Sequence, residues 1–260
     1  MIEAPLAGVH AVVTGGGRGI GLAIARRLAA DGARLTLLGR DQTRLDEAAR
    51  SMPASAGCVA LACDVADAAS IARAFATLAG RGRGLAILVN NAGVATSARL
   101  AATDDALLDQ TLAANLAGTI RCARAALPML LEASHGRIVN VASTAGLVGY
   151  PYVSAYCAAK HGVVGFTRAL ALELAATRVT VNAVCPGYTD TDVVRDAVAN
   201  IVARTGRSET DARAALVTRN PQRRLVAPDE VARTVAWLCH PDSQAVNGQA
   251  VAIDGGEVAG

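Results

Sequence analysis

Short apolar runs alternate with segments of helical periodicity along this chain. Residues 138–141 form an apolar run with strand character, whereas the apolar residues of 71–78 recur at helical spacing. Strands are expected at 10–14, 34–38, 59–62, 85–89, 138–141, 178–184 and 249–253. Strands that alternate with helices form a parallel sheet covered on both faces. The pattern therefore predicts a doubly wound α/β fold.

The hydrophobic share of the composition, 52% of 260 residues, is enough for one large core, and no linker rich in serine, proline or charge divides the chain. We therefore expect a single domain over residues 1–260. One segment departs from the pattern: residues 193–219 hold two short helical patterns, separated near Gly206, with few large apolar residues. We expect a helical substrate lid over residues 190–225.

Charge and hydropathy exclude two classes of partner. The net charge is only +3, and no basic stretch is interleaved with the aromatic residues, which make up 3% of the chain. No apolar run reaches the ~18 residues that a membrane span needs, and residues 1–8 lack the pattern of a secretory signal. We expect a cytoplasmic protein without nucleic-acid or membrane partners.

The spacing of cysteine and histidine argues against a metal site. The six cysteines include no CxxC pair and lie in apolar segments, and the four histidines form no HExxH motif. Buried free thiols and no catalytic metal are expected.

A glycine-rich turn directly follows the first strand. Thr14–Gly21 reads T-G-x-x-x-G-x-G, and helical spacing resumes after it. Glycines let backbone amides and a helix N-terminus approach a pyrophosphate, whose charge the helix dipole stabilises. The common G-x-G-x-x-G fingerprint fails in every register. The turn alone fits a structural role equally well, but its position after the first strand favours a dinucleotide site.

The residues after the second strand bear on the choice of cofactor, because this position meets the adenosine ribose in doubly wound folds. Arg40 could bind the 2′-phosphate of NADP bidentately, whereas Asp41 could accept hydrogen bonds from the ribose of NAD. Arg40 lies closer to the strand end. We expect NADP(H) as the preferred cofactor, with NAD(H) possible if Asp41 turns toward the ribose.

Asn115 lies in the apolar surroundings of the helical segment 104–132. A buried asparagine is costly unless its amide forms hydrogen bonds. Two roles stay open from the residue alone: the amide bends the helix and holds a water molecule, or it makes a structural hydrogen bond.

A serine, a tyrosine and a lysine are placed where one strand and one helix could bring them together. Ser143 follows the strand 138–141, and Tyr156 and Lys160 are four residues apart, on one face of a predicted helix. A nearby ammonium favours the phenolate, so we expect Lys160 to lower the pKa of Tyr156. Ser143 could hold a substrate oxygen beside the phenol. This set suits interconversion of carbonyls and alcohols.

The motifs T-G-x-x-x-G-x-G, N-N-A-G, Ser143, Y-x-x-x-K and P-G-x-x-x-T occur in one order, and through them the chain resembles the short-chain dehydrogenase/reductase family over nearly its whole length. The resemblance implies a Rossmann fold with seven parallel strands, and hydride transfer between a nicotinamide and a carbonyl or secondary alcohol. The catalytic residues that it implies are Asn115, Ser143, Tyr156 and Lys160. The cofactor contacts, with Arg40 added, are Gly15, Gly17, Arg18, Gly19, Ile20, Gly21, Asp64, Val65, Asn91, Ala92, Gly93, Tyr156, Lys160, Pro186, Thr189 and Thr191.

Within the family, the chain looks most like 3-oxoacyl-thioester reductases, polyketide ketoreductases and 3-hydroxybutyrate dehydrogenases. The last group holds a small carboxylate with polar residues where this chain has Ala95, Ala145 and Val153, so a free short 3-hydroxy acid is not expected. A 3-oxoacyl thioester is a candidate substrate. Arginines of the expected lid could bind the phosphates of the coenzyme A or phosphopantetheine carrier to which the acyl group is attached. The alternatives are an NAD-dependent dehydrogenase of small cyclic or aromatic alcohols and a dinucleotide-binding sensor without turnover.

The resemblance also implies a homotetramer. The helix that carries Tyr156 and Lys160 continues through Phe166, Leu170, Leu172 and Leu174. A helix that is apolar on more than one face must bury the second face somewhere. These side chains therefore favour an oligomer, unless the protein's own lid and sheet cover them.

Overall fold

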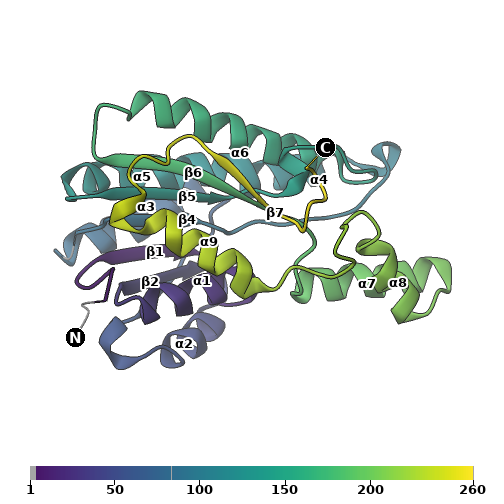
Figure 1. The fold of residues 1–260 in the computed structure, drawn as a ribbon, viewed down its shortest axis with the longest axis horizontal. Coiled ribbons are helices and arrows are strands. Elements are labelled where there is room, and N and C mark those ends of the chain that lie inside the picture. The colour runs from purple at the N-terminus through teal and green to yellow at the C-terminus, as the bar shows by residue number, and fades with distance from the viewer. Residues whose placement is uncertain (1–3, 83, 260) are drawn as a thin grey trace.

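The computed structural model describes residues 4–82 and 84–259 apart from the side chains of Val193 and Arg204; residues 1–3, 83 and 260 of the expected domain lie outside it. One seven-stranded sheet, with the order β3-β2-β1-β4-β5-β6-β7, forms its centre (Figure 1). All neighbouring strands pair in parallel. The strands are β1 His10–Thr14, β2 Arg34–Gly39, β3 Val59–Ala62, β4 Ile87–Asn90, β5 Gly136–Val141, β6 Val179–Pro186 and β7 Ala250–Ile253. The predicted doubly wound fold is confirmed.

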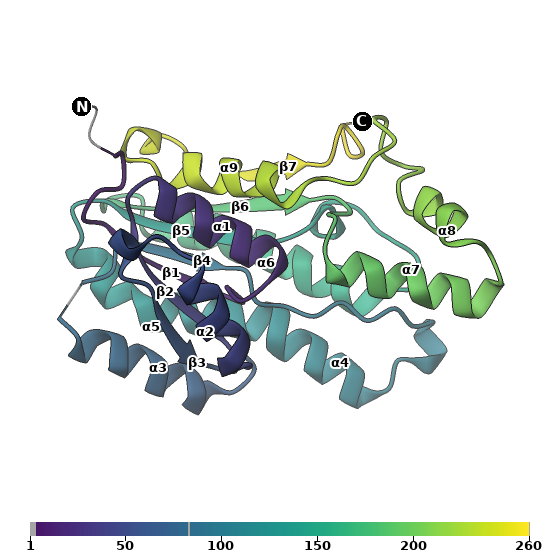
Figure 2. The ribbon, with the colours of Figure 1, turned by 90° about the horizontal axis from the view of Figure 1, so that it is seen from below.

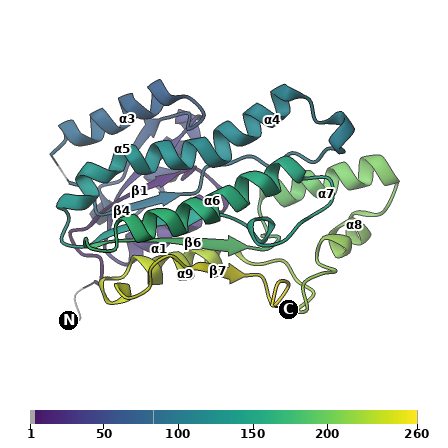
Figure 3. The same cartoon turned by 90° about the horizontal axis from the view of Figure 1, so that it is seen from above.

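Helices cover both faces of the sheet, as Figures 2 and 3 show. The buried residues of α1, α2 and α9 form one hydrophobic cluster with the strands, and those of α3, α5 and α6 form a second cluster on the other face. Every residue of the inner strands β1, β4, β5 and β6 is buried. This explains why their sequences are predominantly apolar. The helices are α1 Gly19–Ala30, α2 Gln42–Arg50, α3 Ala68–Gly80, α4 Asp105–Leu112, α5 Gly118–Glu132, α6 Ser154–Glu173, α7 Asp192–Thr205, α8 Glu209–Leu216 and α9 Pro228–Cys239.

Two predicted helices differ in their limits. The segment 104–132 is divided by a π-helical turn, Ala113–Ala117, between α4 and α5. The helix expected from residue 152 begins at Ser154, because Tyr152 has a left-handed φ of 68° that no helix can contain. These two irregular places lie beside the candidate site.

The predicted lid is formed by α7 and α8, which project beyond the carboxyl ends of the strands (Figure 1). Gly206 ends α7 with a φ of 67°, and Ser208 caps α8 by accepting a hydrogen bond from the amide of Asp211. The buried lid residues Val194, Val198 and Ala212 form a cluster of their own. The lid is thus packed mainly against itself.

The apolar face that suggested an oligomer is only partly free. Leu170 and Leu174 are buried in the protein's own core, and Phe166 packs against the same cluster. Leu172 is 80% exposed. The argument from this helix is therefore reduced to one residue.

Several expectations concerned features outside the sheet. The six cysteines are free thiols, five buried and Cys58 partly exposed. Among the described residues, no three His, Cys, Asp or Glu side chains gather as a metal site requires. In the same part of the chain, no helix combines the length and apolar character needed to cross a bilayer.

Gly21 gives a test of how tightly α1 is packed. A Cβ atom there would lie 2.2 Å from the carbonyl oxygen of Gly15 and 2.5 Å from Nδ2 of Asn91. We expect Gly21→Ala to lower the free energy of unfolding by roughly 1–3 kcal/mol, measured by urea denaturation.

The matched control is Gly165→Ala, at an exposed helical position with no atom within 4 Å of the added Cβ. Alanine should raise the stability there by about 0.5–1 kcal/mol. Equal effects of the two substitutions would contradict the packing at Gly21.

Candidate active site

A cleft of about 1090 Å³ opens at the carboxyl ends of the strands. Parallel strands place these ends at one edge of the sheet, so loops that are distant in sequence meet there. Predicted residues that line the cleft are Gly15, Gly17, Arg18, Gly19, Ile20, Arg40, Asp64, Val65, Asn91, Ala92, Gly93, Asn115, Ser143, Tyr156, Lys160, Pro186, Thr189 and Thr191. Gly21 is the exception: it packs against Gly15 behind the lining.

The glycine-rich turn forms a cradle that side chains would fill. Gly15 and Gly19 have φ values of 65° and 53°, which favour glycine. A Cβ on Gly15 would lie 2.8 Å from Nδ2 of Asn91. Helix α1 begins at Gly19 without a side-chain cap. Its first amides therefore remain available to a phosphate at the positive end of the helix dipole.

Thr14 and Asn91 join the ends of β1 and β4. Oγ1 of Thr14 accepts hydrogen bonds from the amides of Asn91 (2.9 Å) and Ala92 (3.0 Å), and Nδ2 of Asn91 donates to the Thr14 carbonyl (3.0 Å). These bonds hold the glycine-rich turn against the N-N-A-G loop. The two predicted cofactor segments thus form one continuous surface.

The residues after β2 reach the cleft, which Arg40, Asp41 and Arg44 all line. Asp41 caps α2 by accepting a hydrogen bond from the amide of Arg44 (3.1 Å), and its carboxylate lies 3.3 Å from Nε of the same arginine. Capping draws Asp41 into the start of the helix. The sequence analysis did not identify Arg44 as a cleft residue. Its position three residues after Asp41, a typical helix-capping residue, could have indicated that it lies near Arg40.

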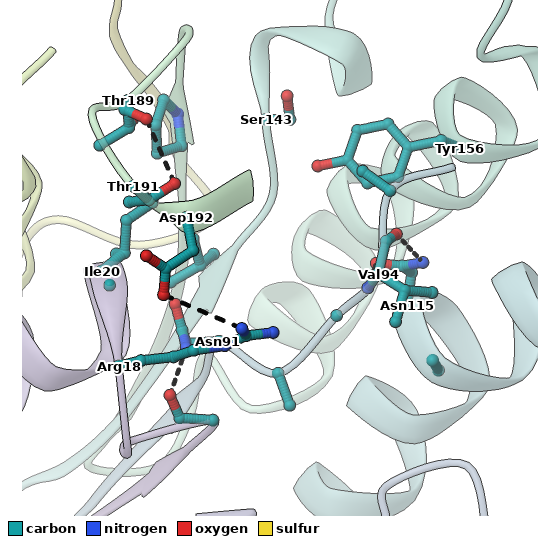
Figure 4. A pocket seen from close by; sticks show the side chains of 18 of the residues that line it. Arg18, Ile20, Asn91, Val94, Asn115, Ser143, Tyr156, Thr189, Thr191 and Asp192 are labelled. Atoms are coloured by element: carbon teal, nitrogen blue, oxygen red, sulfur yellow. Dashed lines mark hydrogen bonds and ion pairs between the residues drawn. The ribbon is translucent and has the colours of Figure 1, made fainter. Parts of the chain in front are cut away.

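The predicted catalytic side chains converge on one part of the cleft. Ser143 follows β5, and its Oγ accepts a hydrogen bond from the amide of Ala145 (3.1 Å). Nζ of Lys160 lies 5.6 Å from the centre of the Tyr156 ring and donates to the Val141 carbonyl (2.8 Å). Figure 4 shows the hydroxyls of Ser143 and Tyr156 pointing into the same part of the pocket. The structure thus brings Ser143, Tyr156 and Lys160 to the same part of the cleft, as the sequence indicated.

Asn115 uses its amide in structural hydrogen bonds. In the π-helical turn, its Oδ1 accepts from the amide of Val94 (3.2 Å), while its Nδ2 donates to the carbonyls of Val94 and Thr111 (both 2.9 Å). The bond to Val94 is drawn in Figure 4. These contacts are the structural hydrogen bonds that were one of the two roles expected for the amide. Asn115 thereby fixes the loop after β4 beside Tyr156.

Comparisons with known proteins agree with this geometry. Residues 9–201 match the family model described as short chain dehydrogenase. The chain belongs to the short-chain dehydrogenase/reductase family. It is therefore an oxidoreductase of that family, as its motifs predicted.

Three similar proteins define its neighbourhood in the family. A ketoacyl reductase of the granaticin polyketide synthase of Streptomyces violaceoruber is 40% identical, over 95% of this chain and 92% of its own. D-beta-hydroxybutyrate dehydrogenase of Rhizobium meliloti is 37% identical, over 95% and 97%. The crystal structure of a tryptophan variant of actinorhodin polyketide ketoreductase with NADPH has a TM-score of 0.90 and 38% identity, covering 96% of this chain and 97% of that one.

Burial sets the protonation of the tyrosine and lysine in this short-chain dehydrogenase. It raises the pKa of Tyr156 to about 12, against a smaller opposing effect of the hydrogen bond with Ser143. It lowers the pKa of Lys160 to about 8. The expected lowering of the Tyr156 pKa is wrong, because burial disfavours the phenolate more than the hydrogen bond with Ser143 favours it. Tyr156 thus keeps its proton at neutral pH, as a proton donor must.

Two aromatic rings form a corner of the cleft beside Thr144, the residue that follows Ser143. Tyr150 and Tyr188 both line it, and their rings meet edge to face with centres 6.4 Å apart. Ala95, Ala145 and Val153 line the same cleft. The sequence analysis did not identify Tyr188 as a residue of the site. Its position directly after the Pro-Gly pair of the P-G-x-x-x-T motif could have indicated that it lines the cleft.

The lid arginines do not support the phosphate-binding role considered from the sequence. Those with described side chains are absent from the cleft lining, where the arginines are Arg18, Arg40 and Arg44. Several are held instead by carboxylates of the same chain: Arg195 by Asp192, Arg213 by Asp190, and Arg224 by Glu230.

Lys160 is the only lysine in the chain, which permits a direct measurement of its pKa. We expect the single Cε resonance of protein labelled with ¹³C-lysine to titrate near pH 8 in the folded state, against the ordinary 10.5. Because the folded pKa is the lower one, the unfolded state binds more protons between these two values. Stability should therefore increase as the pH rises from 8 to 10.5.

Urea-unfolded protein serves as the control and should titrate at the ordinary lysine value. A folded midpoint equal to the unfolded one would show that burial does not destabilise the Lys160 ammonium.

Proposed function

We propose that this protein is a reductase that transfers hydride from NADPH to a carbonyl group, or operates in reverse on the secondary alcohol, with a 3-oxoacyl thioester or related ketone as its substrate. The carrying observation is the convergence of Ser143, Tyr156 and Lys160 beside a dinucleotide cradle. Support also comes from the relatives named as ketoacyl reductases and from the neighbour solved with NADPH.

The residues of the cleft fit a dinucleotide. Gly15, Gly17, Arg18, Gly19 and Ile20 would surround the pyrophosphate at the start of α1, with Asp64 and Val65 at the adenine. The ribose would contact Asn91, Ala92 and Gly93, and the nicotinamide end would meet Pro186, Thr189 and Thr191. When bound, the nicotinamide supplies or accepts the hydride.

The side chains of the protein handle the proton. Ser143 holds the substrate oxygen by a hydrogen bond, and Tyr156 donates its proton to that oxygen as negative charge develops there. The high pKa of Tyr156 keeps this proton in place at neutral pH. Lys160, anchored by the Val141 carbonyl, supports the tyrosine and the ribose. Asn115 keeps the loop at Val94 in position.

The aromatic corner favours one alternative substrate class for the same reaction. Tyr150 and Tyr188 present ring faces and edges that would pack against a cyclic or aromatic ketone or alcohol. The free acid of the hydroxybutyrate dehydrogenases is less well matched, since Ala95, Ala145 and Val153 offer it no polar partner. A sensor without turnover would not need the assembled catalytic residues.

The assembly and setting of the enzyme are also proposals. We place it in the cytoplasm as a homotetramer, with the segment 190–225 acting as a lid over a single domain of residues 1–260. Exposed Leu172 on α6 and half-exposed Trp237 on α9 would be covered by neighbouring subunits.

Tyr156→Phe tests the chemistry. Because the substitution removes the proton donor, kcat for ketone reduction should fall roughly 10²-fold or more, with little change in the Kd for NADPH. Tyr152→Phe, at an exposed tyrosine of the adjoining loop, is the control and should retain its activity. Near-normal kcat in folded Tyr156→Phe would overturn the proton-donor role.

Arg40→Ala tests the cofactor preference. We expect the Kd for NADPH to rise about 10–100-fold and the Kd for NADH to change little, since a charge-assisted bond to the 2′-phosphate is lost. Arg50→Ala, exposed at the end of α2, is the control. If wild type prefers NADH, or if both cofactors weaken equally, the NADP(H) assignment is wrong.

A further inference from the structure

A carboxylate near the end of the chain is buried at the substrate end of the cleft. After β7 the chain turns through Gly255 and Gly256, with φ values of 67° and 92°. Asp254 holds this turn by accepting hydrogen bonds from the amides of Gly256 and Val258, both at 2.9 Å. The turn directs Glu257 inward, and its side chain is only 2% exposed.

Glu257 contacts a residue of the substrate corner. Its Oε1 accepts a hydrogen bond from the Tyr150 hydroxyl at 2.5 Å. The same hydroxyl lies 2.8 Å from Oγ1 of Thr144, the residue after Ser143. A phenol has one proton to donate, and a carboxylate can only accept. Thr144 therefore donates to Tyr150, and Tyr150 donates to Glu257, so both hydrogen-bonding positions of the phenol are occupied.

The lid reaches the same carboxylate through Arg219. Nε of Arg219 lies 3.8 Å from Oε1 of Glu257, and its guanidinium lies 4.6 Å from the centre of the Tyr150 ring. Arg219 also donates to the carbonyl of Gly149 (3.5 Å). The guanidinium covers one face of the ring while its charge compensates the buried carboxylate. Three segments distant in sequence thus meet at Glu257: the loop after β5, the end of the lid and the C-terminal tail.

The other half of the corner is held separately. The carbonyl of Tyr188 accepts from the amide of Val226, and the amide of Asp190 donates to the carbonyl of Val226, both at 2.9 Å. The backbone thus fixes Tyr188, whereas Tyr150 depends on side-chain contacts. Tyr150 is therefore the side of the corner whose position is determined by side-chain contacts.

We propose that Glu257 is a positioning residue that fixes the Tyr150 ring as a wall of the substrate pocket and ties the lid to that wall through Arg219. The C-terminal tail thereby favours large, ring-bearing carbonyl substrates, which can pack against both tyrosine rings, over small acyclic ketones, which have no ring to pack there. This inference rests on the proposed carbonyl reductase function.

The test compares NADPH-dependent reduction of 2-tetralone and of the acyclic 2-butanone. Glu257→Ala should raise the KM for 2-tetralone about tenfold while kcat changes less than about twofold, and the KM for 2-butanone should stay within about twofold. Glu257→Gln retains an acceptor oxygen and should lose much less than the alanine variant. Glu209→Gln, at an exposed carboxylate of the lid, is the matched control and should match wild type.

A double-mutant cycle tests whether Glu257 acts through Tyr150. Tyr150→Phe keeps the ring but removes the hydroxyl, so it should raise the KM for 2-tetralone in the same direction. Adding Glu257→Ala to it should have far less effect than in wild type. Independent, multiplying effects would overturn the proposal, as would equal changes in KM for both ketones. Tyr150→Phe and Glu257→Gln keep the test valid if Glu257→Ala does not fold.

Hydrogen exchange separates this proposal from the proposed function. In Glu257→Ala, peptides covering 144–152 and 209–225 should exchange faster, with peptides of the inner strands unchanged. If wild type reduces no carbonyl compound, the proposed function fails, and the exchange result alone decides whether Glu257 joins the lid to the Tyr150 loop. Unchanged exchange in both segments would reject that link.

Discussion

The hydrogen bond from Lys160 to the Val141 carbonyl joins helix α6 to the end of β5. Through it, the helix that carries Tyr156 and the strand that presents Ser143 take a fixed relation. Gly146 permits the close approach, since a Cβ there would lie 2.7 Å from the Lys160 carbonyl oxygen. The same bond gives a buried ammonium a partner in the protein interior, where an unpaired charge would be costly. The hydrogen bond between Lys160 and Val141 therefore both positions α6 against β5 and holds the side chain of Lys160 beside Tyr156.

The opposite edge of the sheet is fastened by another buried cation. Arg137, at the start of β5, is fully buried and donates to the carbonyls of Gly136, Arg178, His240 and Pro241. It ties β5 to the start of β6 and to the end of α9, where the helix dipole favours positive charge. In the sequence, this arginine reads as an ordinary charge at a strand end. The candidate catalytic residues thus lie at the carboxyl ends of the strands, and the hydrogen bonds of Arg137 join the chain segments at their amino ends.

The fold could be read from the sequence because its inner strands are buried and therefore consist mainly of apolar residues. The Ser143, Tyr156 and Lys160 set was equally accessible, since one strand end and one helical spacing define it. The burial of individual side chains could not be predicted from the sequence. The shift of the Tyr156 pKa depends on what covers the ring, and the Tyr150–Glu257 contact joins residues 107 apart. Among the pairs of the lid arginines, the one between Arg213 and Asp190 joins residues 23 apart, so it too depends on tertiary geometry.

The separate hydrophobic cluster of the lid has a consequence for how the enzyme can change. Val194, Val198 and Ala212 pack with one another rather than in the clusters that flank the sheet. Such a segment can open or unfold locally at a lower free energy than global unfolding, because the sheet core stays covered. Substitutions inside it therefore act on a small cooperative unit and leave the scaffold's stability largely untouched. The sequence of α7 and α8 can therefore vary while the clusters that flank the sheet keep their packing.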